Sequence, residues 1–160
     1  MSQGALQKAL MPSLLDRLID PRSLGTSARP WYDVQQMTRA VQRDLRALLN
    51  SRQTHQGLLD NYPQCGESLL TFGLPDFPSI DASTTAECAA VGRDLEEVIR
   101  RFEPRLGDVR VTMNTSPGNC ERRVHYLVEA TLNVDPAPNV AFDVILELAT
   151  GQYDVETRIT

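Results

Sequence analysis

The sequence predicts an α+β fold in which two long helices cover one face of a four-stranded antiparallel meander, with an N-terminal arm. Two stretches, which begin near residues 33 and 84, place apolar residues at steps of three and four, the period of an amphipathic helix. After residue 106 apolar and polar residues alternate, the period of a half-buried strand. The links between these strands are too short for parallel crossovers, so the strands are expected to pair antiparallel.

Length and composition indicate one domain with an arm. The chain has 160 residues, of which 41% are hydrophobic, enough apolar material for one core and too little length for two ordinary domains. Proline and glycine interrupt residues 1–30 too often for one long helix. We therefore predict a partly helical arm over residues 1–30 and a single domain over residues 31–160.

The arm contains one short amphipathic pattern. Leu14, Leu15 and Leu18 recur at helical spacing after Pro12, a residue that suits the first turn of a helix. Two interpretations of this apolar stripe stay open: it packs on its own domain, or it docks on a partner.

Each long helix has a start signal. Asp33 with Gln36, and Thr84 with Glu87, have the spacing of a capping box. The residue before Pro104 is disfavoured in a helix, so the second helix is expected to end there. The apolar faces that follow the two start signals are Val34, Met37, Val41, Leu45 and Leu48 in the first helix, and Val91, Leu95, Val98, Ile99 and Phe102 in the second.

The stretch from residue 61 to 81 is expected to be an ordered connection. Its prolines and glycines favour turns, and we predict that its apolar residues are buried anchors. These anchors are Leu69, Leu70, Phe72 and Leu74.

Four strands follow from alternating apolar residues. The predicted inward positions are Val109, Val111 and Met113; then Val124, Tyr126, Val128, Ala130 and Leu132; then Val140, Phe142, Val144, Leu146 and Leu148; and finally Tyr153, Val155 and Ile159.

Charge and composition exclude several classes of protein. A net charge of −5 gives no general attraction to nucleic acid, and no local basic patch overrides it. No apolar run is long enough to insert in a membrane, and the first twenty residues lack a secretory signal, so we expect a cytoplasmic protein. The three cysteines, Cys65, Cys88 and Cys120, are read as reduced and structural because they are odd in number and widely separated.

Catalytic and cofactor signals are weak. His55 and His125 have no second ligand at metal spacing, and the chain contains no nucleophile elbow, P-loop or dinucleotide fingerprint. Acidic residues that a glycosidase needs are present, as in any acidic protein, but sequence cannot show their separation. We expect no enzyme activity, no metal and no cofactor.

Four strings, in order along the chain, carry a resemblance to a known family. They are PSLLDRLID at Pro12 to Asp20, RDLRALLNSR at Arg43 to Arg52, FGLPDF at Phe72 to Phe77, and FEPRL at Phe102 to Leu106. The last contains a Glu-Pro-Arg triplet. Together they resemble the TssE family of type VI secretion baseplate subunits, which is related to the lysozyme-like wedge proteins of contractile phage tails. The strands to Thr160 fit this family by pattern alone.

The resemblance implies a structural protein that links the baseplate wedge to the contractile sheath and initiates sheath polymerisation. The implied partners are sheath proteins of the TssB and TssC type and wedge proteins of the TssF, TssG and TssK type. A physical route is available, since a meander is expected to leave unpaired backbone groups on its edge strands, where a sheath arm can add a strand.

The resemblance also selects partner-binding residues. Pro104 is expected to break the helix, while Glu103 and Arg105 either brace the protein's own strands or contact a partner, and both roles stay open. Arg43, Asn50 and Arg52 are candidates for contact with wedge subunits, and Leu14, Leu15 and Leu18 for docking of the arm to the wedge.

Two other functions belong to the same fold. One is a regulatory adaptor that binds a response regulator, and the other, least favoured, is a peptidoglycan-cleaving lysozyme. The lysozyme conflicts with the missing export signal and lacks a defined acid and nucleophile.

Overall fold

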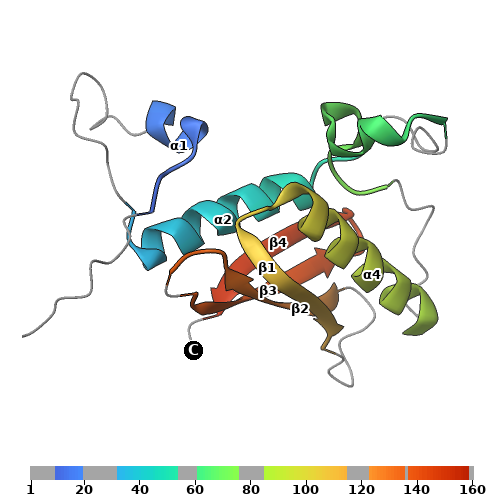
Figure 1. Ribbon diagram of the computed structural model, residues 1–160. Coiled ribbons are helices and arrows are strands. Elements are labelled where there is room, and N and C mark those ends of the chain that lie inside the picture. The colour runs from blue at the N-terminus through green and yellow to red at the C-terminus, as the bar shows by residue number, and fades with distance from the viewer. Residues whose placement is uncertain are drawn as a thin grey trace, which may run out of the picture.

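One four-stranded sheet organises the molecule. In the computed structural model, which describes residues 10–19, 32–53, 61–75, 85–114, 123–135 and 137–158, the strands are β1 (Leu106–Met113), β2 (Arg123–Leu132), β3 (Asn139–Glu147) and β4 (Gln152–Arg158). They pair antiparallel in the order β1-β2-β3-β4 (Figure 1). This is the predicted meander.

Two long helices lie on the same face of the sheet. α2 (Val34–Leu49) packs along β4, and α4 (Thr85–Phe102) packs along β1 (Figure 1). The core between the layers includes Val41, Leu45, Leu95, Ile99, Val128, Phe142 and Val144, each at most 3% exposed. Burial of these apolar side chains supplies the main driving force for folding. The predicted α+β fold class is confirmed.

Local signals explain where the helices begin and end. The Asp33 carboxylate accepts from the backbone N–H of Gln36 at 2.7 Å, and the Gln36 side chain accepts from the N–H of Asp33 at 3.0 Å, so the first capping box is confirmed. Thr84 lies outside the described residues. α4 ends at Phe102, two residues before Pro104, where the ring disfavours further helix.

The strand pattern is also confirmed, with one irregularity. Alternate residues of β2, β3 and β4 point into the core, as the period of two predicts. In β1 the register shifts between Gly107 and Arg110, and Asp108 has a φ of 48°. β1 is therefore a bulged edge strand, whereas the pairing of β4 with β3 is regular. Ile159 lies outside the described residues.

The connection between the helices contains two short 3-10 helices, η2 (Pro63–Glu67) and η3 (Leu69–Thr71). Leu74 is fully buried, but Leu69 is 89% exposed and Leu70 46%, so the prediction that these two leucines are buried is wrong. The residue of η3 that turns inward is Thr71, whose hydroxyl lies within hydrogen-bond distance of the carbonyl oxygens of Cys65, Gly66 and Ser68.

A close backbone approach attaches this connection to the end of α2. Leu74 N–H donates to Ser51 O at 3.0 Å, and Gln53 N–H donates to Leu74 O at 2.9 Å. Gly73 has a φ of 102°, and a Cβ there would lie 2.5 Å from Ser51 O, so only glycine fits. Phe72 also meets Phe102 edge to face, with ring centroids 5.3 Å apart.

The described part of the arm contains one short helix, α1 (Leu14–Ile19). Its chain joins the domain where Tyr32 N–H donates to Leu10 O at 2.9 Å. Among the described residues no helix has the length and apolar character needed to cross a bilayer.

Candidate functional site

The Glu-Pro-Arg triplet forms a tight, internally paired turn between α4 and β1. Glu103 is 4% exposed, and its Oε1 accepts from Arg105 Nε at 2.6 Å and from the Arg105 N–H at 3.3 Å. The second carboxylate oxygen accepts from Arg105 Nη2. Such a two-point pair is the geometry in which guanidinium binds carboxylate most strongly. Glu103 and Arg105 thus pair with each other across the turn.

Arg105 also connects this turn to α2. Its Nη2 donates to Asp44 Oδ2 at 2.7 Å. Burial would lower the pKa of Arg105, but the carboxylates of Glu103 and Asp44 outweigh it and raise the pKa above its ordinary value. Arg105 therefore stays charged and bridges the end of α4 to the middle of α2.

One nitrogen of Arg105 is left over. Nη1 is buried and has no hydrogen-bond partner within the part of the chain that the structure describes. A cavity of 590 Å³ opens beside this side chain, lined partly by Leu10, Met11 and Val134. One donor group of the guanidinium is therefore unused.

Asn133 positions the backbone of the turn. Its side chain donates to Pro104 O at 2.9 Å, and its N–H donates to Arg105 O at 2.8 Å. A Cβ at Gly107 would lie 2.6 Å from the Asn133 side-chain oxygen, so glycine permits this approach. Sequence reasoning missed Asn133, because no local pattern relates the turn after β2 to the start of β1.

The charged network continues from Asp44 to the arm. Arg43 Nη2 lies 2.7 Å from both Asp44 Oδ1 and Asp16 Oδ1. Asp16, 3% exposed, also accepts from the N–H of Ser13 at 3.2 Å and from its hydroxyl at 2.8 Å. Burial would raise the pKa of the Asp16 carboxyl, but hydrogen bonds from Ser13 and Arg43 hold that pKa below its usual value. We call Asp16, Arg43, Asp44, Glu103 and Arg105 the charged network.

The predicted arm residues are exposed. Leu14 is 74% exposed, Leu15 53% and Leu18 77%, and Met11 beside them is 57% exposed. In the described residues, the other large exposed apolar side chains are Tyr62, Leu69 and Leu70, on the connection around η2 and η3. We call Met11, Leu14, Leu15 and Leu18 the arm cluster. Tyr62, Leu69 and Leu70 form the 3-10 cluster. Sequence reasoning missed the 3-10 cluster, because it assigned Leu69 and Leu70 to the core.

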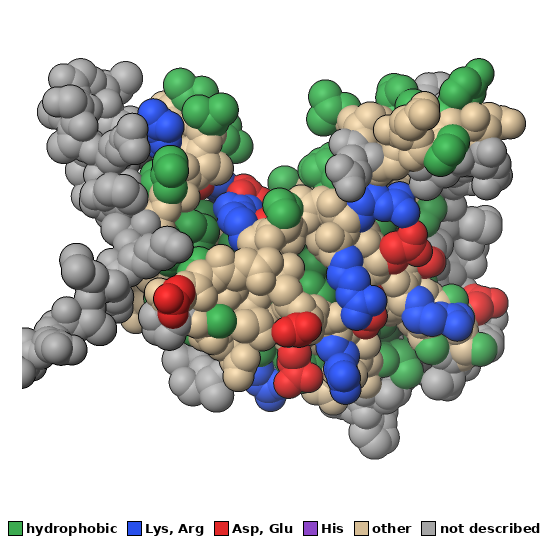
Figure 2. Space-filling view, viewed as in Figure 1, with side chains coloured by type: hydrophobic (Ala, Val, Ile, Leu, Met, Phe, Trp, Pro, Cys, Tyr) green, Lys and Arg blue, Asp and Glu red, His purple; other side chains and the backbone are tan. Residues whose placement is uncertain are grey.

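The two clusters lie on one side of the molecule. Figure 2 shows them on two projections separated by a hollow, with acidic and basic side chains at the foot of the arm. In Figure 1, α1 stands over the N-terminal half of α2, and the 3-10 helices stand beyond its C-terminal end. The charged network connects α1, α2 and the turn after α4, so it occupies the region between the arm and the core.

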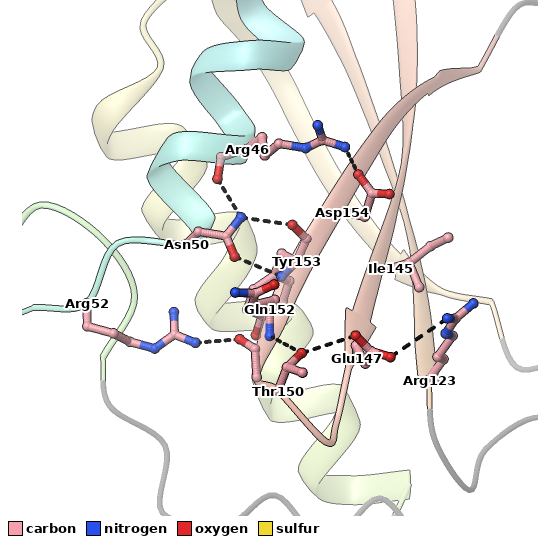
Figure 3. Close-up of a pocket in the computed structure, with 11 residues that line it drawn as sticks. Arg46, Asn50, Arg52, Arg123, Ile145, Glu147, Thr150, Gln152, Tyr153 and Asp154 are labelled. Atoms are coloured by element: carbon pink, nitrogen blue, oxygen red, sulfur yellow. Dashed lines mark hydrogen bonds and ion pairs between the residues drawn. The ribbon is translucent and has the colours of Figure 1, made fainter.

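The remaining predicted residues, Asn50 and Arg52, lie away from this network at the start of β4 (Figure 3). Asn50 donates to Tyr153 O at 2.8 Å, and Arg52 donates to Gly151 O at 2.7 Å. The nine residues chosen from the sequence therefore form two groups, one at the arm and the Glu-Pro-Arg turn and one at β4.

The sheet edges differ from expectation. Outward-facing backbone groups at Val109 and Val111 of β1, and at Tyr153 and Val155 of β4, are hydrogen bonded to helix side chains. The prediction that the edges keep unpaired groups is wrong at these positions. The physical reason is that each long helix runs along an edge, where its polar side chains reach the strand.

The described residues contain no cluster of three histidine, cysteine or acidic side chains that could hold a metal ion. Cys65 and Cys88 are not in disulfides, and Cys120 lies outside the described residues. The charged side chains gathered here are paired with one another. This arrangement suits packing and recognition of another protein surface.

Comparison with known families supports a structural role. The sequence model of the family described as baseplate wedge protein gp25 matches residues 35–137. Comparison with curated proteins and with solved structures gave no match. The match spans α2, the connection, α4, β1 and β2, and it includes three of the four strings that carried the resemblance. The chain belongs to the gp25 baseplate wedge family, the family of structural baseplate proteins to which TssE belongs.

Proposed function

We propose that this chain is a TssE-type subunit that links the wedge of a type VI secretion baseplate to the contractile sheath and initiates sheath polymerisation. The family match supports a baseplate role with other baseplate and tail proteins as partners. The arm string at Pro12 to Asp20, which lies outside the matched residues, favours the secretion system over a phage tail. In this proposal the chain binds in the cytoplasm, without catalysis or a cofactor.

The observation that carries the proposal is the concentration of exposed apolar side chains in two clusters. A chain that buries its core well still leaves Leu14 and Leu18 about three-quarters exposed, at 74% and 77%. Large apolar side chains gathered on one side of a protein usually mark an interaction surface. We assign the arm cluster to wedge proteins of the TssF, TssG and TssK type, with the 3-10 cluster as a second point of contact.

The charged network holds the arm in place for that contact. Asp16 and Arg43 tie α1 to α2, and Arg105 ties α2 to the turn after α4. Glu103, Pro104 and Arg105 therefore act mainly as a brace. Sheath proteins of the TssB and TssC type are assigned to the four-stranded sheet.

The test is capture of purified wedge and sheath proteins by the tagged full chain. The triple variant Leu14→Ser, Leu15→Ser and Leu18→Ser should reduce wedge binding by at least about tenfold. Each serine removes most of the apolar side-chain area that the leucine would bury against the wedge protein. Sheath binding should stay unchanged. Arg39→Ala, on the exposed face of α2, is the matched control and should bind both partners normally.

Two results would contradict the proposal. Full wedge capture by the triple variant would show that the arm does not dock there. Capture of neither partner by the wild-type chain would remove the baseplate linker role, and a response regulator and a peptidoglycan suspension, tested in the same experiment, would then identify an adaptor or a lysozyme.

A further inference from the structure

The sheet is covered on its inner face and along its edges, but not on its outer face. Asn50 and Gln42 of α2 donate to Tyr153 O and Val155 O at 2.8 Å along β4, and side chains of α4 likewise bond the backbone of β1. Both long helices pack on the inner face (Figure 1). The outward side chains of the four strands are all exposed or half-buried. A partner that leaves the helices in place therefore meets the sheet on this outer side.

Three apolar side chains lie together at the centre of the outer side. Leu127 of β2 stands opposite Asp143 of β3, so Ala141 and Ile145, two positions to either side of Asp143, are its diagonal neighbours. Such neighbours lie about 7–8 Å apart. All three are half-buried, and Figure 3 shows Ile145 on the side of the sheet away from α2. We call Leu127, Ala141 and Ile145 the apolar strip, and the outer side of the sheet around it the open face.

Two like charges face each other beside the apolar strip. Asp143 of β3 stands directly opposite Glu156 of β4, an arrangement that destabilises the free chain because the two carboxylates repel. Arg158 Nη1 lies 3.9 Å from Asp143 Oδ1, beyond the range of about 2.7–2.9 Å that a charge-assisted hydrogen bond requires. Glu156 has no ion pair among the residues that the structure describes. The open face therefore keeps negative charge that its own arginines do not neutralise.

Loosely paired acids and two hollows continue this pattern at the ends of the strip. At one end Arg123 Nη2 and Glu147 Oε1 are 3.7 Å apart. At the other end Glu129 stands opposite Arg110 in the register but forms no ion pair within the described part of the chain. A cavity of 660 Å³ opens beside Glu147, and one of 400 Å³ beside Glu129. The hollows have room for the side chains of a partner.

One helix has the right size for the open face. Four strands at a spacing of about 4.8 Å are about 14 Å wide, and the nine residues of β3 extend for about 30 Å. A helix with its side chains is about 10–12 Å across, and about 20 residues of it span 30 Å. A helix packed here would complete a sandwich in which both faces of the sheet are covered by helices.

We propose that the open face binds an amphipathic helix of a partner protein, in which lysine or arginine side chains flank an aliphatic stripe. The stripe packs on the apolar strip, and a cation of the helix lies between Asp143 and Glu156. The repulsion of these two acids is relieved only in the complex, so they favour a basic helix over a neutral or acidic one. The inference goes beyond the proposed function, because it involves neither apolar cluster and needs no assignment of wedge or sheath.

The probe is a labelled twenty-residue helical peptide of alanine, leucine and lysine, with leucines along one face and lysines on both flanks. Its counterpart carries glutamate in place of lysine. Asp143→Asn with Glu156→Gln removes two charges from the open face, and the matched control, Glu87→Gln with Glu97→Gln, removes two charges from exposed positions of α4. Binding to the full chain is measured by fluorescence anisotropy at low and high salt, after circular dichroism confirms folding.

The wild type should bind the lysine peptide at least about tenfold more tightly than the glutamate peptide. The open-face variant should bind the lysine peptide about fivefold more weakly than the wild type at low salt, because two ion pairs are lost, and high salt should remove that difference. Leu127→Ser should weaken binding about threefold, because the apolar strip loses a contact. The α4 control and the triple variant of the arm leucines should bind as the wild type does.

An equal loss of binding in the open-face variant and the α4 control would indicate attraction to net charge alone and would overturn the proposal. A loss confined to the arm variant would overturn it as well. Glu156→Gln by itself should melt at or above the wild-type temperature, since a repulsion is removed, and a lower melting temperature would contradict the like-charge argument. The assay contains no wedge or sheath protein, so its failure leaves the capture experiment for the proposed function intact.

Discussion

At the scale of single residues, the Glu-Pro-Arg turn is a buried charge pair. Glu103 is 4% exposed, so its carboxylate needs a partner to offset the loss of water. Arg105 supplies it at 2.6 Å and shares its charge with Asp44 at 2.7 Å. Removing one member leaves the other charge uncompensated, which costs more than removing both.

Arg105→Met should therefore lower the free energy of unfolding by about 2–3 kcal/mol. Adding Glu103→Gln should restore part of the loss, with a coupling of more than about 1 kcal/mol in a double-mutant cycle followed by urea denaturation. Arg110→Met, on the exposed side of β1, is the control and should change stability by less than about 0.5 kcal/mol. A coupling near zero would contradict the brace.

At the scale of elements, α1 depends on contacts outside itself. Helices this short are unstable alone, because nucleation costs more than a few hydrogen bonds return. α1 has six residues. Its stability comes from the Ser13 and Asp16 side chains at its start and from the contact between Asp16 and Arg43 at 2.7 Å.

Arg43→Ala should loosen α1, with amide hydrogen exchange in Leu14–Ile19 faster by about tenfold, whereas Arg39→Ala should leave it unchanged. Because the pKa of Asp16 is lowered from 3.8 in the folded chain, the contact is complete well above that pH. It is lost as pH falls below 3.8 through the lowered pKa. Unchanged exchange in Arg43→Ala would show that α1 is held elsewhere.

At the scale of the whole molecule, two buried tyrosines connect the helix layer to the sheet. Tyr126 donates from its hydroxyl to Cys88 O of α4 at 3.0 Å. Tyr153, at the start of β4, is 3% exposed. Burial raises the pKa of Tyr126 above its ordinary value and raises the pKa of Tyr153 to about 12.

Stability should therefore fall at high pH. Because the folded-state pKa values are raised, the stabilisation is complete below the ordinary value of 10.0 and is lost as pH rises through the folded values. The free energy of unfolding should drop by about 2–3 kcal/mol per pH unit above pH 10. Chemical denaturation measured from pH 8 to 11.5 checks this, and Tyr126→Phe with Tyr153→Phe should flatten the curve.

Much of the fold could be predicted because its signals are local. The Asp33 capping box, the stop before Pro104 and the alternation through Tyr126 and Phe142 each depend on neighbours within a few residues. The same reasoning failed for Leu69, because a short apolar run does not show which side chain turns inward. It was Thr71 that did so, because its hydroxyl finds carbonyl acceptors there.

The sequence by itself determined the two helices and the antiparallel meander, and it selected the Glu-Pro-Arg residues and the arm leucines as candidates. Only the tertiary structure decided that Asp44 and Asn133 complete the turn, that Asn50 and Gln42 cover β4, and that the apolar clusters share one side. The physical reason is distance along the chain. Contacts such as Asn50 with Tyr153 join residues a hundred positions apart, and helical or strand periodicity carries no information about which distant backbone groups a side chain will meet.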